Sequence, residues 1–307
     1  MRFGVDDWTG RKVFLTGHTG FKGSWLTLLL SELGAEITGY SLEPSTNPSL
    51  FEKARVGDVV KRSVIADIRE YDRLENELRN AQPDVVFHLA AQPLVRYSYE
   101  HPVETYSTNV MGTVHVLEAA RKVGGVKAVV AVTSDKCYEN REWVHPYRET
   151  DPMGGHDPYS SSKGCSELVI AAYRKSYFGD GSEGPKTAVA SVRAGNVIGG
   201  GDWSTDRLIP DIVRAFETSQ TPAIRSPGAV RPWQHVLEAL IGYVAIADRL
   251  FAGKAEFADA WNFGPGEDDT QTVAWIVDRM ARSWGAQRDY RDWSGSIPHE
   301  AGLLPLG

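Results

Sequence analysis

The chain has 307 residues, 42% hydrophobic and 24% charged, and its 33 basic and 40 acidic side chains give a formal net charge of −7. This is the composition of an ordinary globular protein, large enough for one big α/β unit or two unequal lobes. The acidic balance argues against partners that bind through a global positive field, such as nucleic acid or an anionic membrane. An anionic substrate would therefore be held by local cations.

The only cysteines are Cys137 and Cys165, too few for a disulfide framework and without the paired spacing of a zinc site. Histidines His18, His88 and His235 do not converge with cysteines or carboxylates at metal-ligand spacing, so we expect no metal. Residues 1–12 do not have the pattern of a signal peptide, and no run approaches the ~20 apolar residues of a membrane helix. We expect a cytoplasmic protein.

Short apolar runs alternate with longer helical patterns through the first half of the chain, which is typical of βαβ units and a parallel sheet. Strands are predicted, in chain order, at Lys12–Thr16, Glu36–Tyr40, Val64–Ala66, Val85–Leu89, Ala128–Thr133 and Thr187–Val192. Helices are predicted at Ser24–Leu33, Tyr71–Asn80, Val103–Lys122 and Tyr159–Phe178. These patterns favour an α/β fold with a Rossmann-type doubly wound parallel sheet.

After about Ala194 the sequence becomes punctuated by glycine, proline and tryptophan, as suits loops that close over a ligand. We therefore expect a large domain at residues 1–190 and a smaller substrate-binding lobe at 191–307. The segment 179–186, GDGSEGPK, is predicted to be a surface loop.

Three glycines, Gly17, Gly20 and Gly23, are spaced G-x-x-G-x-x-G between the first predicted strand and the first predicted helix. Glycine suits a tight turn that approaches a pyrophosphate closely, and the helix N-terminus that follows favours an anion. The placement predicts a dinucleotide site in the large domain. A glycine-rich turn without a ligand remains the alternative.

The second strand does not end in the usual acidic partner for a ribose, although Ser41 or Glu43 could serve. No arginine or lysine follows closely to bind a 2′-phosphate, which favours NAD over NADP. Asp67, after the third predicted strand, is a candidate contact for the adenine amino group. Its alternative is the N-cap of a helix that begins at Ile68.

Tyr159 and Lys163 are spaced i, i+4, which places both side chains on one face of a helix. A lysine cation beside a phenol would lower the pKa of Tyr159, so that a phenolate could accept a sugar hydroxyl proton. Ser134 stands at the end of the strand predicted at Ala128–Thr133. The combination predicts a dehydrogenase-type catalytic centre.

With these residues the chain resembles the extended short-chain dehydrogenase/reductase family over essentially its whole length. Within that family it is similar to the CDP-glucose 4,6-dehydratases. The strings that carry the similarity are GHTGFKG, LAAQPLV at 89–95, TSDKCY at 133–138, RAGNVIGGGDW at 193–203 and VRPWQHV at 230–236.

The resemblance implies a reaction on bound NAD with no net redox change. Tyr159 would deprotonate the C4 hydroxyl while hydride passes to NAD, with Ser134 hydrogen-bonded at the reacting oxygen and Lys163 holding the nicotinamide ribose. Water would then leave across C5 and C6, and hydride would return to C6. The product would be a 4-keto-6-deoxy sugar for deoxysugar and O-antigen polysaccharide synthesis.

Asp135 and Lys136 stand where related hexose dehydratases carry Asp-Glu, and elimination needs an acid for the C6 hydroxyl and a base at C5. Asp135 would be the acid if burial raises its pKa. Lys136 as the base would have to be neutral, which like-charge repulsion from Lys163 could promote. The alternative for both is a solvated surface pair.

The resemblance also implies the remaining contacts. The cofactor-binding residues are expected to be Gly17, Thr19, Gly20, Phe21, Lys22, Gly23, Asp67, Ile68, Leu89, Ala90, Ala91, Asn109, Tyr159 and Lys163. The substrate-binding residues are expected to be Gln92, Asn196, Arg207 and Arg231, because guanidinium groups bind phosphate oxygens in a fork. Arg193 is a weaker candidate, and arginines of this kind could instead form surface salt bridges. Trp203 and Trp233 could pack on sugar or base, or in a core.

Two other functions stay open: a sugar-nucleotide 4-epimerase or reductase, which would not need Asp135, and a shortened NAD-binding protein without turnover. The chain stops at Gly307, where relatives would be expected to continue, which puts the nucleotide-base pocket in question. A homodimer is expected from the resemblance, and the helices predicted at 103–122 and 159–178 could form its contact.

Overall fold

The computed structural model describes residues 7–141, 143, 145–178, 187–266, 269–286, 289–292 and 306. The segment 179–186, for which we predicted a surface loop, lies outside the described residues.

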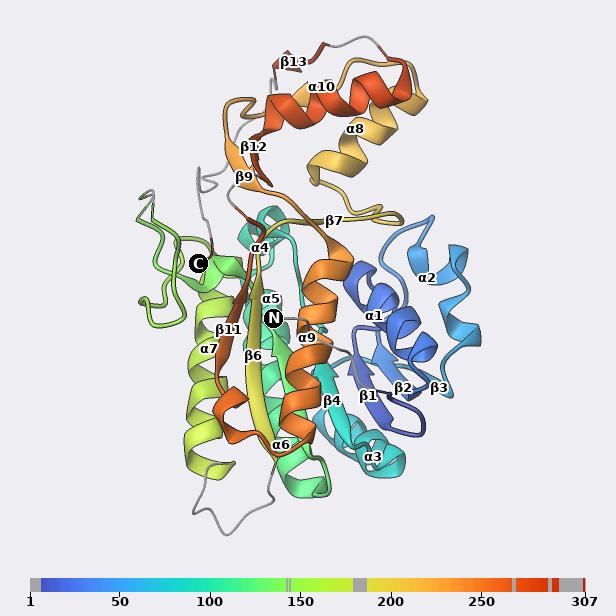
Figure 1. Ribbon diagram of the computed structural model, residues 1–307, viewed down its shortest axis with the longest axis vertical. Helices are drawn as coiled ribbons and strands as arrows, with labels where there is room; N and C mark the ends of the chain where they lie inside the picture. Colours follow the sequence, from blue (N-terminus) through green and yellow to red (C-terminus); the bar gives the residue numbers. More distant parts are fainter. Residues whose placement is uncertain are drawn as a thin grey trace.

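The centre of the molecule is a parallel sheet of seven strands in the order β11-β6-β5-β4-β1-β2-β3, each pair parallel (Figure 1). Its strands are β1 (Lys12–Thr16), β2 (Glu36–Ser41), β3 (Arg62–Ile65), β4 (Val85–His88), β5 (Ala128–Val132), β6 (Ala188–Ala194) and β11 (Ala260–Phe263). The six predicted strands are confirmed, with ends that shift by one or two residues. The doubly wound Rossmann-type fold is confirmed with them.

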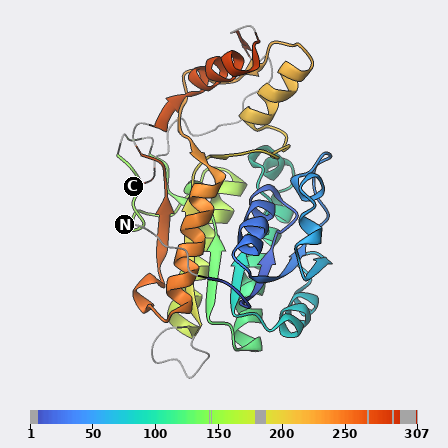
Figure 2. The ribbon, with the colours of Figure 1, turned by 45° about the vertical axis from the view of Figure 1, so that its right-hand side comes forward.

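Helices cover both faces of this sheet (Figure 2). They are α1 (Phe21–Glu32) and α9 (Val236–Phe251) on one face, and α3 (Tyr71–Ala81), α6 (Gly112–Val123) and α7 (Pro158–Tyr177) on the other. Successive residues of a strand point to opposite faces, so each strand contributes to two cores. In β1, Val13 and Leu15 pack under α1 and α9, whereas Phe14 packs under the other layer. Burial on both faces explains why these strands are apolar throughout.

The helix predicted at Val103–Lys122 is continuous but not uniform. It consists of α5 (Pro102–Tyr106), a π-helical turn at Ser107–Met111 and α6. The wider turn contains Asn109, whose side chain is 2% exposed and hydrogen-bonds outside the helix. Such π turns occur frequently at functional sites.

A second, smaller layer stands above the sheet in Figure 1. Its helices α8 (Leu208–Glu217) and α10 (Val273–Trp284) share their own core, which includes Ile212, Phe216 and Val277. Three pairs of short strands accompany them: β7 (Val197–Ile198) with β10 (Gln234–His235), β8 (Ala223–Ile224) with β13 (Arg291–Asp292), and β9 (Val230–Pro232) with β12 (Thr270–Thr272). The remaining short helices are α2 (Leu50–Lys53), α4 (Val95–Glu100) and 3₁₀ turns at Val56–Asp58, Asp135–Cys137 and Ala255–Phe257.

The division into domains 1–190 and 191–307 stays a prediction. Two elements that follow residue 190 belong to the large layer: α9 packs on the sheet, and β11 pairs with β6 at its edge. Neither had been predicted from the sequence. In the part of the chain that the structure describes, no helix has the length and apolar character that a bilayer crossing requires.

The glycine turn between β1 and α1 is tight. Gly17 has a left-handed φ of +82°, and a Cβ added to it would lie 2.8 Å from the Ala90 backbone nitrogen. A Cβ on Gly23 would lie 1.9 Å from the Gly17 carbonyl oxygen, because α1 begins directly against the turn. Both glycines are therefore needed for the turn itself.

We expect Gly17→Ala to destabilise the protein more than Gly10→Ala does. Gly10 has a similar φ of +75° but open space around the Cβ position, so its replacement should lower the free energy of unfolding by about 1–2 kcal/mol from backbone strain alone. Gly17→Ala adds the clash with Ala90, worth roughly 1–3 kcal/mol more. Urea-induced unfolding of both variants measures the difference, and equal losses would contradict the close packing of this turn.

Candidate active site

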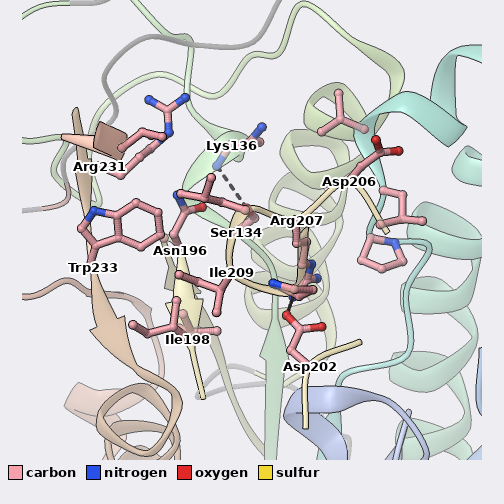
Figure 3. Close-up of a pocket in the computed structure, with 18 of the residues that line it drawn as sticks. Ser134, Lys136, Asn196, Ile198, Asp202, Asp206, Arg207, Ile209, Arg231 and Trp233 are labelled. Atoms are coloured by element: carbon pink, nitrogen blue, oxygen red, sulfur yellow. Dashed lines mark hydrogen bonds and ion pairs between the residues drawn. The ribbon is translucent and has the colours of Figure 1, made fainter. Parts of the chain in front are cut away.

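A cavity of ≈ 390 Å³ lies between the ends of the central strands and the smaller layer (Figure 3). It is lined by residues that follow β4, β5 and β6, by Lys22 of α1, by the start of α8, and by β8 and β9 with the residues near them. Parallel α/β sheets bind ligands outside the carboxyl ends of their strands, which is where this cavity lies.

Four of the five predicted catalytic residues line this cavity: Ser134, Asp135, Lys136 and Tyr159. The first three follow β5, and Tyr159 is the second residue of α7. Lys163 lies one turn further along α7 and is 6% exposed. The alternative of a solvated Asp135-Lys136 pair is wrong for Asp135, which is 9% exposed.

The Ser134 side chain organises the turn that follows β5. Its Oγ donates to Asp135 Oδ1 at 2.8 Å and accepts from the Lys136 backbone N–H at 3.2 Å. The same N–H donates to Asp135 Oδ1 at 2.9 Å. These bonds close the 3₁₀ turn at Asp135–Cys137 and fix the Asp135 carboxyl beside the Ser134 hydroxyl.

The pKa of Tyr159 departs from the sequence-based expectation. Burial raises it to about 12, and a hydrogen bond with Ser134 opposes that rise. The expectation that Lys163 would lower the Tyr159 pKa is wrong: desolvation of the buried phenolate is the largest effect, and the groups that lower the pKa are Ser134 and Arg207. Ser134 is the neighbour that most favours the phenolate.

Two lysines beside the cavity are desolvated. Burial lowers the pKa of Lys163 to about 8, against an opposing effect of the Glu167 carboxylate. Burial also lowers the pKa of Lys22 to about 8, with a further contribution from Arg207, while Asp135 raises it. Lys22 lies at the start of α1 and lines the cavity, so the glycine turn places a cation next to the catalytic residues.

Burial raises the pKa of the Asp135 carboxyl, whereas Lys136, Ser134 and Lys22 favour its ionised form. The expectation that burial would raise this pKa is confirmed. A carboxyl with a raised pKa keeps its proton at higher pH and can act as a general acid.

The expected dinucleotide contacts gather around the glycine turn. Thr19 Oγ1 donates to the Leu42 carbonyl at 2.8 Å and is hydrogen-bonded to Ser41 Oγ at 2.8 Å. The backbone N–H of Ala90 donates to Thr16 Oγ1 at 3.2 Å, which holds the segment after β4 against the turn. This segment includes Leu89 and Ala91.

Asp67 does not cap a helix at Ile68, because α3 begins only at Tyr71. Its carboxylate accepts from the Arg69 backbone N–H at 2.8 Å and from the Arg69 guanidinium. This arrangement lowers the pKa of Asp67 and keeps it ionised. Ile68 itself is 4% exposed and packs against Gly112 of α6.

Asn109 and Gln92 are joined by hydrogen bonds. Asn109 Oδ1 accepts from the Gln92 N–H at 2.8 Å, and Asn109 Nδ2 donates to Ser162 Oγ on α7 at 2.8 Å. The Gln92 side chain bonds Thr105 Oγ1 at 2.9 Å and the Leu94 N–H, and Gln92 is not among the cavity-lining residues. Gln92 thus supports the loop after β4, and its role as a substrate contact stays a prediction.

Asn196, Arg207 and Arg231, which the sequence predicts to bind substrate, line the cavity together with Trp233 (Figure 3). Arg207 pairs with Asp202 at 2.9 Å. Arg193 does not take part, because its guanidinium is buried against Glu167. The interpretation of Arg193 as a phosphate ligand is wrong.

Sequence reasoning missed two further arginines of the cavity. Arg96 and Arg225, far apart in the chain, both pair with Asp206 Oδ1, at 3.0 and 2.8 Å. Asp206 adopts a left-handed φ of 59°. Nothing in the sequence around either arginine distinguishes it from a surface residue, since only the fold brings them to one carboxylate.

His88 is a core histidine, as expected, between Thr16 Oγ1 at 2.8 Å and Thr113 Oγ1 at 3.2 Å, and burial lowers its pKa to about 3. His18 lies in the glycine turn and is hydrogen-bonded to Ser63 Oγ at 2.7 Å. Among the described residues, no three histidine, cysteine or acidic side chains are grouped so that they could hold a metal ion.

Known proteins are similar to this chain in sequence and in fold. The chain is 57% identical over 97% of its length to the CDP-glucose 4,6-dehydratase of Salmonella typhimurium, covering 83% of that protein. It is 30% identical over 69% of its length to a UDP-glucose 4-epimerase of Mycolicibacterium smegmatis, covering 74% of it. A solved dTDP-glucose 4,6-dehydratase from Streptomyces venezuelae, crystallised with NAD, superimposes with a TM-score of 0.76 at 26% identity, over 96% of this chain and 87% of that one.

The family model described as the NAD dependent epimerase/dehydratase family matches residues 13–264. This range spans the large sheet from Val13 onward, the predicted catalytic residues and the cavity-lining residues except Val273. The chain therefore belongs to the NAD dependent epimerase/dehydratase family.

Proposed function

We propose that this chain is an NAD-dependent hydro-lyase that converts CDP-glucose to CDP-4-dehydro-6-deoxyglucose and water. The observation that carries the proposal is the position of Asp135. Its buried carboxyl lines the same cavity as Tyr159, so an acid for a leaving hydroxyl stands beside the base for a sugar hydroxyl. An enzyme that only oxidises the sugar needs the base, Tyr159, but not the acid, Asp135. The identity to the Salmonella enzyme supports the choice of CDP-glucose.

The glycine turn fits NAD. The tight turn at Gly17, where any Cβ would clash, and the N-terminus of α1, which begins directly after Gly20, make a cradle of backbone amides for a pyrophosphate. Around it we assign Thr19, Phe21, Lys22, Gly23, Asp67, Ile68, Leu89, Ala90, Ala91 and Asn109 to the cofactor. Bound NAD supplies the acceptor for hydride from C4 and its donor to C6.

Tyr159 and Ser134 act on the C4 oxygen. Tyr159, as its phenolate, accepts the hydroxyl proton. Ser134 turns its single hydroxyl proton from Asp135 to the C4 oxygen, where it stabilises the keto oxygen that forms. Lys163 supplies a positive charge under Tyr159 and a donor for the cofactor ribose. Burial excludes water, so these effects operate at low dielectric.

Asp135 protonates the C6 hydroxyl as it leaves. The raised pKa of Asp135 keeps the proton available. Lys136 follows directly and is assigned to removal of the C5 proton. The substrate diphosphate is assigned to Asn196, Arg207 and Arg231, which line the far side of the cavity. The use of the product in deoxysugar and O-antigen polysaccharide synthesis stays a prediction, as does the cytoplasmic location of the protein.

The direct test incubates the purified chain and NAD with CDP-glucose, and separately with UDP-glucose and dTDP-glucose. Mass spectrometry should find a product lighter by one water and carrying a 4-keto group from CDP-glucose. Turnover of only another base would overturn the assignment of CDP, and bound NAD with no product from any substrate would overturn the enzymatic function.

Asp135→Asn separates dehydration from oxidation. The amide cannot donate a carboxylic proton, so we expect product formation to fall by about 10²-fold or more. Reduced nicotinamide should nevertheless form on mixing with substrate, because Tyr159, Ser134 and Lys163 are unchanged. If the rate of product formation falls by less than about threefold, another group is the acid, and an epimerase or reductase is favoured.

The alkaline side of the pH profile should report Lys163. Its ammonium is charged below a pKa of about 8, so kcat/KM should fall as pH rises through that value. The charged and titratable groups that face it are Glu167, Cys137, Lys22 and His88. Lys22 has a similar pKa, so Lys22→Arg serves as the control: the fall should persist in it. A profile that stays flat above pH 8 would contradict the role of Lys163.

We further propose a homodimer formed by the layer of α5, α6 and α7. These helices pack on one another and expose large apolar side chains on that layer. The exposed set on these helices and on the π turn between α5 and α6 is Val103, Tyr106, Met111, Leu168 and Tyr177, with Tyr99 of α4 beside them. A symmetric contact would bury this surface, as is usual for two-fold interfaces.

Leu168→Asp should shift the protein to monomers in sedimentation velocity, because Leu168 is 61% exposed in the middle of α7 and a carboxylate there would be buried on association. Ile241→Asp is the matched control, since Ile241 is exposed on α9 at the opposite face of the sheet. An unmodified chain that sediments as a monomer would refute the dimer.

A further inference from the structure

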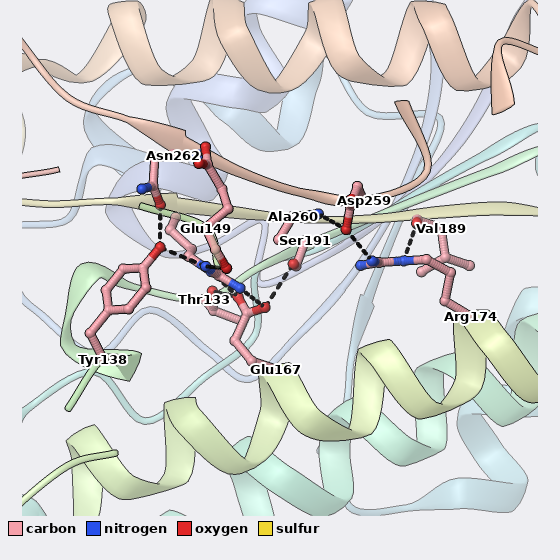
Figure 4. A network of polar contacts seen from close by, with 11 residues as sticks. Thr133, Tyr138, Glu149, Glu167, Arg174, Val189, Ser191, Asp259, Ala260 and Asn262 are labelled. Atoms are coloured by element: carbon pink, nitrogen blue, oxygen red, sulfur yellow. Dashed lines mark hydrogen bonds and ion pairs between the residues drawn. The ribbon is translucent and has the colours of Figure 1, made fainter. Parts of the chain in front are cut away.

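A buried ion pair joins α7 to β6 next to the segments that carry the predicted catalytic residues, and Figure 4 shows Glu167 with its neighbours. Glu167 of α7 and Arg193 of β6 are 4% and 3% exposed, and they meet through Nε–Oε1 at 2.9 Å and Nη2–Oε2 at 2.6 Å. This fork geometry is the strongest form of a carboxylate–guanidinium contact. A buried pair nevertheless adds little net stability, because desolvation of both charges offsets their attraction.

The Glu167–Arg193 pair contacts each of the three segments that carry a predicted catalytic residue. Glu167 is one helical turn after Lys163 on α7 and accepts from Thr133 Oγ1, the residue before Ser134. Arg193 Nη1 donates to the Tyr138 hydroxyl at 2.6 Å. Tyr138 ends the 3₁₀ turn that carries Asp135 and Lys136.

The Tyr138 hydroxyl extends the contact to the sheet edge. It donates to Asn262 Oδ1 on β11 at 2.8 Å, and the Asn262 N–H donates to Glu149 Oε1 at 2.8 Å. Tyr138 is 1% exposed and does not line the cavity. It can therefore affect the reaction only through the position of its own segment.

We propose that Glu167, through Arg193, is a positioning residue that holds the three catalytic segments in one geometry. The inference rests on the proposed dehydration. One carboxylate fixes the end of β5 through Thr133, the 3₁₀ turn through Arg193 and Tyr138, and α7 through its own backbone. The two parallel hydrogen bonds between Glu167 and Arg193 fix the relative orientation of these side chains. A shift of any one segment therefore breaks a charged hydrogen bond inside the core.

The charge of Glu167 adds a second effect. It opposes the lowering of the Lys163 pKa by burial, so that more of Lys163 stays protonated near neutral pH. Cys137, Lys22 and His88 also face Lys163 from the neighbouring elements. Loss of the Glu167 charge should therefore lower the Lys163 pKa further.

The test uses variants that each remove one hydroxyl from the network and leave the ion pair in place. Tyr138→Phe releases the turn that bears Asp135, and we expect kcat for dehydration to fall about tenfold with KM unchanged, since small displacements of catalytic groups have effects of this size. Reduced nicotinamide should accumulate during turnover, because elimination is slowed and oxidation is not. Calorimetric binding of NAD should not change.

Ser191→Ala is the matched control. Ser191 Oγ donates to Glu167 Oε2 at 2.8 Å from the middle of β6, a strand without catalytic residues. We expect a similar loss of thermal stability with kcat within about twofold of the unmodified chain. If Tyr138→Phe and Ser191→Ala lose activity only in proportion to their stability, the network is merely structural and the inference is refuted.

Glu167→Gln tests the charge. It should move the alkaline fall of kcat/KM to lower pH, provided that the variant folds. The hydroxyl variants decide the question if it does not. Failure of the unmodified chain to dehydrate CDP-glucose refutes the proposed function, whereas equal behaviour of the hydroxyl variants in an active enzyme refutes only the positioning role.

Discussion

The parallel direction of the seven strands is the constraint on which the site depends. Every strand of the large sheet ends at the same edge, so the residues that follow β1, β4, β5 and β6 are gathered there without any need for closeness in sequence. The glycine turn, the Asn109 contact, Ser134 with Asp135, and Asn196 each occupy one of these ends. The smaller layer then closes the edge into a cavity.

Burial sets the chemistry of that cavity. Desolvation is the largest influence on the pKa values of Tyr159, Lys163, Lys22 and Asp135, and it pushes the acids upward and the lysines downward. The two lysines and Asp135 are thereby brought nearer to proton exchange at neutral pH, whereas the Tyr159 phenol is moved further from it. The charged partners around them, such as Glu167 and Lys136, moderate these shifts rather than cause them.

Local patterns in the sequence were sufficient for six of the seven strands of the large sheet and for the residues that the structure gathers at the cavity. Apolar runs of three to six residues predicted the six strands, and the spacing of Tyr159 and Lys163 predicted that both lie on one helix. The motifs also singled out Asp135, which the structure places in the cavity wall. What such patterns cannot supply is long-range pairing. The strand β11 is only four residues long and does not stand out, and Arg96 and Arg225 reach Asp206 only through the fold.

The same limit explains the errors at Arg193 and Tyr159. An arginine beside a glycine-rich loop has the pattern of an anion ligand, but the partner that occupies it is a glutamate on a different element. The pKa of Tyr159 depends on how completely the fold removes water, which spacing does not encode. Both errors concern groups that only the fold brings next to the residue.

The pairing of β11 with β6 has a consequence for how the chain acquires its structure. β6 leaves the sheet at Ala194, and the chain forms α8, the short strands β7 to β10 and α9 before it returns at Ala260 to complete the edge. During synthesis, the nascent sheet therefore exposes an open strand edge until Phe263 has left the ribosome. Such edges invite pairing with other chains, and closing so long a loop slows folding. The two layers should consequently fold together, and the protein should be most prone to aggregation before β11 pairs with β6.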